Sequence, residues 1–284
     1  MSPDRLYVHP ALVLPLRPDS APSAPMTSPK HSPLKNPPPR VAGQSLDEEL
    51  ARLLDDDVTP WLAVATLAIV LAGMEWLRWA FDYQPHPVLA SIGAVLVVNF
   101  CVWKVLSYRR RIRALKLGRD GEREVGAMLE ELRADGCVVI HDIVGDGFNL
   151  DHVVLSTRGL FAIETKTVSK PDGKANITYD GERVLIDGVG DYTRAVDQAI
   201  AEAAWLRKLC ASLTGKTYVV QSVVVFPGWY VEPRKPPSQC PAWVLNPKAL
   251  AGFLAAAREQ IPEGEVRALV HHLRQHIQNQ QQDR

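Results

Sequence analysis

Two carboxylates and a lysine in the middle of the chain have the spacing of a hydrolytic site. Residues 149–167, NLDHVVLSTRGLFAIETKT, predict two apolar strands joined by a turn. Glu164 and Lys166 are two residues apart in the second strand, so their side chains lie on one face. Asp151, near the start of the first strand, is the candidate second carboxylate.

The position of Asp151 depends on the turn between these two strands. A two-residue turn at Arg158 and Gly159 places Asp151 opposite Lys166 and diagonal to Glu164, so that all three side chains form one patch. A three-residue loop places Asp151 on the other face unless a bulge corrects it. The expected site therefore depends on the register of the hairpin.

Such a patch suits a hard divalent cation. Neighbouring carboxylates repel each other, and Mg²⁺, or alternatively Mn²⁺, prefers carboxylate oxygens and water. The carbonyl of Thr165 is a further candidate ligand. A bound metal ion lowers the pKa of water and stabilises charge on a phosphate. Lys166 would orient the attacking water or balance that charge, which completes the parts for metal-assisted phosphodiester hydrolysis.

A solvated hairpin face with weak ion pairs is the alternative interpretation of the same residues. Two observations favour a site. The strands are too apolar for a wholly exposed hairpin, and Glu122, within GRDGERE on the preceding predicted helix, is available as a third carboxylate.

The residues around this hairpin predict a mixed α/β domain. Helical periodicity and turn signals indicate a turn and helix over 118–136, strands over 137–144 and 217–227, a hairpin turning at Asp180-Gly181, a helix over 191–213, a short strand over 243–245, and helices over 247–258 and 263–280. This order predicts a mixed sheet flanked by helices.

Two apolar spans precede the domain, at residues 61–81 and 87–106. Each has about the twenty residues that a helix needs to cross a bilayer, and the short connection DYQPHP predicts a transmembrane hairpin over 58–107. A soluble hairpin with an apolar core is the alternative, but the second span has no polar face. Tryptophans and tyrosines near the span ends are typical of an interfacial belt.

The charges around these spans predict their orientation. The basic linker 108–117 follows the second span, and the connection between the spans has no lysine or arginine. The positive-inside rule places the linker, the domain and both termini in the cytoplasm, with the hairpin in the inner or plasma membrane. Contact of the basic cluster with nucleic acid or anionic lipid is a second role.

The N-terminal region and the overall composition add fewer constraints. Residues 1–45 are Pro-rich and predict a disordered tail, and residues 46–57 predict a short amphipathic helix capped by Ser45 with Glu48. The 32 basic and 32 acidic residues give zero net charge. The four cysteines have no zinc-site or disulfide spacing, which favours a reducing compartment.

Other polar residues are expected to be structural or solvated. His152 adjoins Asp151 and should face the other side of its strand, and His141 is similar. His272 and His276 are four apart on a helix but have no third ligand in the sequence pattern. Near the hairpin, Lys170, Lys174 and Arg183 would either contact phosphates or be solvated. No dinucleotide fingerprint follows Gly145 and Gly147, so we expect no organic cofactor.

Four blocks in order, GRDGEREVGAMLEEL, NLDHVVLSTRGLFAIETKT, AVDQAIAEAAWLRKL and VVVFPG, resemble the nuclease-related domain, NERD. The resemblance covers roughly residues 118–228, followed by a loop and helices over 229–284. It implies the PD-(D/E)xK restriction-endonuclease-like fold and a site formed by Glu122, Asp151, Glu164, Lys166 and Gln198. Leu, in place of the proline of the parent pattern, precedes Asp151.

The resemblance and the residues together predict a membrane-anchored, metal-dependent nuclease. Its metal would be held by Asp151, Glu164 and Glu122, and its substrate would be nucleic acid, DNA in preference to RNA, in DNA processing. A catalytically inactive nucleic-acid-binding or membrane-organising module on the same fold is the alternative. A soluble helical-hairpin adaptor is a third interpretation.

Overall fold

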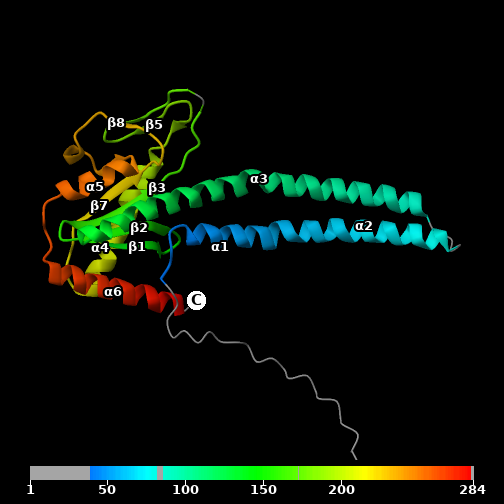
Figure 1. The fold of residues 1–284 in the computed structure, drawn as a ribbon, viewed down its shortest axis with the longest axis horizontal. Coiled ribbons are helices and arrows are strands. Elements are labelled where there is room, and N and C mark those ends of the chain that lie inside the picture. The colour runs from blue at the N-terminus through cyan, green and yellow to red at the C-terminus, as the bar shows by residue number, and fades with distance from the viewer. Residues whose placement is uncertain (1–38, 82–85, 172, 283–284) are drawn as a thin grey trace, which may run out of the picture. The chain divides into compact units, whose positions relative to one another are not determined.

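A computed structural model describes residues 39–81, 86–171 and 173–282 (Figure 1). The predicted Pro-rich tail, up to residue 38, and most of the DYQPHP connection lie outside the described residues.

Two long helices begin the described chain and lie side by side (Figure 1). The helical elements are α1 (Gln44–Arg52), the π-helical η1 (Leu53–Val58), α2 (Thr59–Ala80) and α3 (Pro87–Glu131). The indole N–H of Trp76 donates to Ser91 at 2.9 Å, and the ring of Trp61 lies 5.6 Å from that of Phe100. The first contact pairs the end of α2 with the start of α3, and the second pairs the start of α2 with a residue further along α3, so the two helices are antiparallel.

The apolar residues of α2 and α3 are mostly exposed. Both helices are long and apolar enough to cross a membrane, and only 6% of the most apolar stretch of each is buried. A core helix of a soluble protein would bury such a stretch, because a large exposed apolar surface is unfavourable in water. These helices are therefore compatible with a membrane anchor.

The helix α3 continues from the apolar span into the domain, which differs from the expected linker at 108–117 and turn at 118. It has no break at Gly118 or Gly121. A β-carbon at Gly121 would lie 1.7 Å from Oγ1 of Thr167, so glycine is required here for close packing. The glycines that indicate a turn in the sequence instead allow a helix to approach a strand end.

The expected cap at Ser45 is wrong. The N-cap of α1 is Gly43, which has a positive φ of 75°, and no side chain caps the helix. Ser45 instead donates through its hydroxyl and its backbone N–H to the two carboxylate oxygens of Asp142, at 2.5 and 2.9 Å. The segment before the membrane helices is thereby attached to the first strand of the domain.

The domain contains two mixed sheets flanked by helices, which confirms the predicted fold class. One sheet has the order β1-β2-β3-β7-β9 and the other β6-β5-β4-β8. The strands are β1 (Val138–Val144), β2 (Asn149–Ser156), β3 (Gly159–Thr165), β4 (Ile177–Tyr179), β5 (Val184–Ile186), β6 (Gly190–Asp191), β7 (Val220–Val225), β8 (Val231–Pro233) and β9 (Ala242–Leu245). The first three are antiparallel, and β3, β7 and β9 are mutually parallel.

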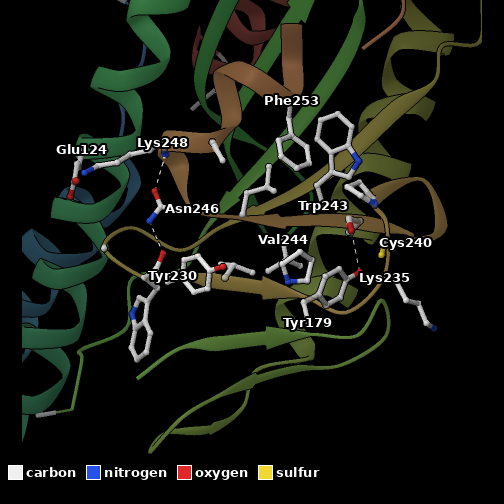
Figure 2. Close-up of a pocket in the computed structure, with 18 of the residues that line it drawn as sticks. Glu124, Tyr179, Tyr230, Lys235, Cys240, Trp243, Val244, Asn246, Lys248 and Phe253 are labelled. Carbon is white, nitrogen blue, oxygen red and sulfur yellow. Dashed lines mark hydrogen bonds between the residues drawn. The ribbon is translucent and has the colours of Figure 1, made fainter. Parts of the chain in front are cut away.

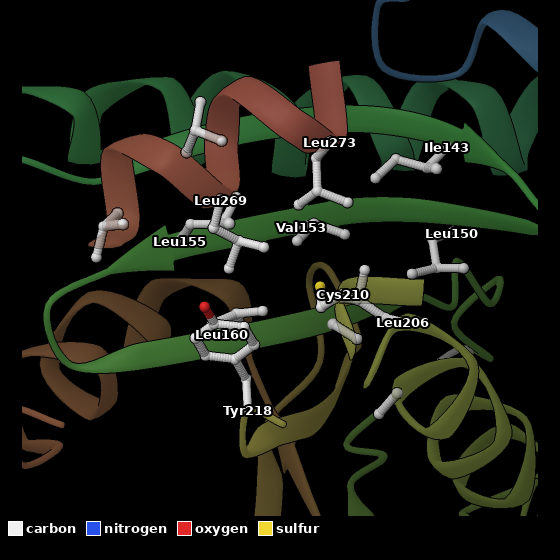
Figure 3. Close-up of a cluster of buried hydrophobic side chains, with 14 residues drawn as sticks. Ile143, Leu150, Val153, Leu155, Leu160, Leu206, Cys210, Tyr218, Leu269 and Leu273 are labelled. Carbon is white, nitrogen blue, oxygen red and sulfur yellow. The ribbon is translucent and has the colours of Figure 1, made fainter. Parts of the chain in front are cut away.

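Helices cover both faces of the five-stranded sheet. The remaining helices are η2 (Leu132–Asp135), α4 (Arg194–Thr214), η3 (Pro237–Gln239), α5 (Pro247–Ala256) and α6 (Glu263–Gln282). On one face, Leu155 and Leu160 pack with Leu206 of α4 and Leu269 of α6 (Figure 3). Each such fully buried side chain contributes about 1.5–3 kcal/mol relative to an exposed one. The other face packs against α3 and α5.

The β2–β3 hairpin has a register two residues from the expected one. Ser156 pairs with Gly159 and His152 with Ile163, so Thr157 and Arg158 form the turn, and Asp151 falls opposite Glu164 instead of Lys166. A shift of two residues keeps every side chain on its expected face. Asp151, Glu164 and Lys166 therefore still share one face, although the register differs from the expected one.

Candidate functional site

The centre of the site is Glu164, at the carboxyl end of β3. Its side chain is buried, with 3% of the residue exposed. One carboxylate oxygen, Oε1, accepts from the amide of Gln198 at 2.9 Å and from the ammonium of Lys166. The amide of Gln198 also donates to Glu202 at 2.8 Å, and its oxygen accepts from Lys166 at 2.9 Å. Strand β3 and helix α4 thus share one hydrogen-bonded network.

Two further carboxylates approach this network from other elements. Asp151 of β2 accepts through Oδ2 from the backbone N–H of Thr165 at 2.7 Å. Glu122 comes from α3, which reaches the end of β3 because Gly121 packs against Thr167. Glu122 is buried, and its charge is close enough to influence both Asp151 and Glu164.

The three flanking carboxyls have raised pKa values. Burial, followed by the charges of Asp142 and Glu164, raises the pKa of Glu122 to about 8. Burial, followed by Glu164, raises that of Glu202 to about 8. The pKa of Asp151 lies well above its usual range because of burial and then the charge of Glu164. Each proton held at neutral pH relieves a repulsion that a cation would also relieve.

Lys166 provides the positive charge of the site. Burial disfavours its ammonium, but the charges of Glu164 and Asp151 outweigh burial and raise its pKa. The ammonium is therefore charged at neutral pH and is fixed between Glu164 and Gln198.

Several buried polar atoms at the end of β3 have no hydrogen-bond partner. Among the described residues these are Oε2 of Glu164 and the hydroxyls of Thr165 and Thr167. Buried polar groups are nearly always satisfied, so the unpartnered Oε2 of Glu164 is suited to bind a further group.

Residues 117–227 match the NERD family, the nuclease-related domain. The match includes every residue of the network, from Glu122 on α3 to Glu202 on α4. No curated protein and no solved structure was found to match the chain.

The donor atoms of the acidic network are of the kind that a divalent metal ion prefers, although they do not converge on one point. Carboxylate oxygens are the ligands that Mg²⁺ prefers, and the unpartnered oxygen of Glu164 is such a donor. Within the described ranges, however, no three His, Cys, Asp or Glu side chains are arranged to hold a metal ion. The ammonium of Lys166 instead contacts Glu164. Metal binding would require that contact to open.

Two residues of the site were not identified from the sequence. Glu202 lies one helical turn after Gln198, so the spacing of four was the signal that could have indicated it. Asp142 of β1 has a positive φ of 52° and is 2% exposed. Its carboxylate accepts from Arg40 at 2.8 Å, and no feature of the sequence indicates this contact.

The histidines of the NERD domain are placed as structural residues. His152 is fully buried and faces away from Asp151, and burial lowers its pKa to about 3. Its Nδ1 lies 2.9 Å from Nδ1 of His141, whose other ring nitrogen is 2.7 Å from Glu130. Neither histidine contacts the acidic network through any hydrogen bond among the described residues.

The remaining candidates lie apart from the network. Lys170 donates to the carbonyl of Gly228 at 3.0 Å, and Arg183 pairs with Asp191 at 3.4 Å. Lys174 is exposed. On α6, His272 is exposed and His276 is half-buried, as expected for a largely solvated helix face.

Proposed function

We propose that the chain is a membrane-anchored nuclease that hydrolyses phosphodiester bonds of nucleic acid, DNA in preference to RNA, with Mg²⁺ or Mn²⁺. The main support is the gathering of Glu122, Asp151, Glu164 and Glu202 around Lys166, with three carboxyl pKa values raised. A surface ion pair would not produce buried, mutually repelling carboxylates. The match to a nuclease-related family gives independent support.

Each residue has a distinct role in this proposal. Asp151, Glu164 and Glu122 would hold the metal ion, which when bound supplies Lewis-acid stabilisation of the phosphate and a water of lowered pKa. Lys166 donates hydrogen bonds to a phosphate oxygen or to the attacking water. Gln198 orients Lys166 and Glu164 through its two ends. Glu202, whose pKa is raised to about 8, is suited to donate the proton that it holds at neutral pH.

The test uses the full chain purified in detergent. Labelled single-stranded DNA, duplex DNA and RNA are incubated with Mg²⁺, with Mn²⁺ and with EDTA. Glu164→Gln and Lys166→Met should each lower the cleavage rate at least about a hundredfold, in keeping with the loss of an electrostatic group from a transition state. Cleavage that persists unchanged in EDTA or in both variants contradicts the proposal.

A matched control is available near the amino end of β7, opposite the carboxyl ends of the strands that carry the site. Lys216 precedes β7 and pairs with Glu265 at 2.9 Å, so Glu265→Gln removes a similar carboxylate–ammonium contact far from the strand ends that carry the site. This variant should cleave at the parental rate. Binding without cleavage in the parent protein would instead identify the inactive binding module.

We also propose that α2 and α3 cross the membrane, with the domain in the cytoplasm. The exposed apolar surface of both helices and the arginines after the second span support this orientation. In right-side-out and inverted vesicles, protease should reach the domain only in the inverted ones. Release of the chain by alkaline carbonate would contradict the anchor.

A further inference from the structure

A second concave site lies beside the acidic network and is formed almost wholly outside the NERD match. It is a pocket of about 710 Å³ between α5, β8 and β9 (Figure 2). All but three of its lining residues lie beyond residue 227, where the family match ends.

The lining combines aromatic rings with lysines. Tyr179, Tyr230, Trp243 and Phe253 surround the space (Figure 2). Trp243 is held by edge contacts with Phe253, at 5.3 Å between ring centres, and by Phe161, at 5.8 Å. Tyr230 is 63% exposed, although it is a large aromatic residue. An aromatic face that is open to solvent is a surface on which a flat ring can stack.

The charge of the lining is positive. Lys170, Lys235 and Lys248 are exposed residues of the pocket, and Glu124, which approaches Lys248 at one end, is its single acidic residue (Figure 2). Lys170 also lies 5.2 Å above the ring of Trp229. Aromatic faces with surrounding ammonium groups are complementary to a base and to the phosphates that flank it.

The strand register places the pocket next to the acidic network. Thr165 of β3 pairs with Val225 of β7, which pairs with Leu245 of β9, a residue of the pocket. All three strands are parallel, so these positions lie together at the carboxyl ends of the strands. Two strand spacings separate β3 from β9 by about 10 Å, which is the length of about three stacked nucleotides.

We propose that this pocket binds an unstacked base of a single-stranded segment, about two or three nucleotides from the phosphate at Glu164 and Lys166. Stacking on the exposed ring of Tyr230 holds the base, and the lysines contact its backbone. This inference rests on the proposed function and specifies its substrate: a nucleic acid with an unpaired region, not a continuous duplex.

The binding test is made in EDTA, where cleavage does not contribute. Anisotropy of a labelled single strand is measured with the full chain in detergent. Tyr230→Ala should weaken binding about tenfold, and Lys248→Ala should weaken it and reduce its salt dependence. Val219→Ala and Lys216→Ala are controls, because both residues are exposed near the amino end of β7. They should bind as the parent does.

Two substrate comparisons separate base stacking from charge. Tyr230→Ala should have little effect on a strand with abasic residues, and the parent should bind a duplex of the same sequence more weakly than the single strand. Photo-crosslinking with 5-iodouracil should join Tyr230 or Trp243 to the strand. Equal binding by parent and Tyr230→Ala, with no crosslink in the pocket, overturns the proposal. The binding test does not depend on cleavage. Failure of the proposed function would appear as binding without cleavage, whereas failure of the pocket proposal would appear as binding that Tyr230→Ala does not change.

Discussion

The raised carboxyl pKa values predict that metal-free protein loses stability as the pH rises. Glu122 and Glu202 have pKa values of about 8 in the folded state against an ordinary 4.5. Between these values the folded protein holds protons that the unfolded chain has released. The free energy of unfolding therefore falls with rising pH until about pH 8, which is the opposite of the usual carboxylate behaviour.

The magnitude follows from proton linkage. For one carboxyl with these two pKa values, the loss between about pH 6 and about pH 8 is about 2 kcal/mol. Glu122→Gln and Glu202→Gln remove a titrating group while keeping its shape, so each variant should lose about 2 kcal/mol less than the parent over this range. His152, whose pKa is lowered to about 3, contributes equally to the pH dependence of the parent and of both variants. Its contribution therefore cancels when the proteins are compared.

The assay is urea unfolding of the full chain in detergent with EDTA, followed by near-ultraviolet circular dichroism. Glu265→Gln is the control, because the pKa of Glu265 is lowered by Lys216 and its titration lies at acid pH. Added Mg²⁺ should stabilise the parent most at high pH, since the cation binds the ionised carboxylates. Identical pH dependence in the parent and both glutamine variants would refute the account of a repelling cluster.

Three further outcomes are expected. Gly121→Ala places a methyl group against Thr167 and should lower the free energy of unfolding by about 1–3 kcal/mol. The thermal midpoint and the nuclease activity should both fall. Gly252→Ala on α5 is the control and should change neither, because nothing lies within 4 Å of the added methyl group. Asp142→Ala removes the buried carboxylate that pairs with Arg40 and leaves that guanidinium with the more exposed Glu48 as its ionic partner, so it should destabilise the protein by about 3–5 kcal/mol in urea unfolding. Deletion of the apolar hairpin, residues 58–107, should remove the need for detergent in ultracentrifugation, and aggregation of the shortened chain without detergent would count against the anchor.

Much of the domain could be predicted from local sequence, because its elements carry strong periodic signals. Both strands of the central hairpin lie within the predicted residues 149–167, and the helices at 194–214 and 263–282 were predicted within a few residues. Alternation along β3 correctly placed Glu164 and Lys166 on one face.

The hairpin register could not be predicted, because distant contacts fix it. The guanidinium of Arg158 donates to the carbonyl of Ala257 at 2.8 Å, and the carbonyl of Thr157 accepts from the backbone of Gln260 and Ile261. These contacts hold Thr157 and Arg158 in the turn from a segment about a hundred residues away. A local reading of Arg158-Gly159 contains none of that information.

The continuity of α3 was missed for a related reason. Glycine signals a break when only the chain is considered, but Gly121 is needed for the close approach to Thr167. The role of Asp142 was equally inaccessible, since its partners Arg40 and Ser45 lie about a hundred residues earlier and form no pattern with it.

Because α3 is unbroken from Pro87 to Glu131, it fixes the distance between the apolar span and the acidic network. Glu122 follows the end of the apolar span by sixteen residues, a rise of about 24 Å along the helix. Under the proposed anchoring and activity, bonds would be cut only within a thin layer next to the lipid, and a change in bilayer thickness that tilts the helix would move Glu122 with it. Freely diffusing nucleic acid that never approaches the membrane would be spared.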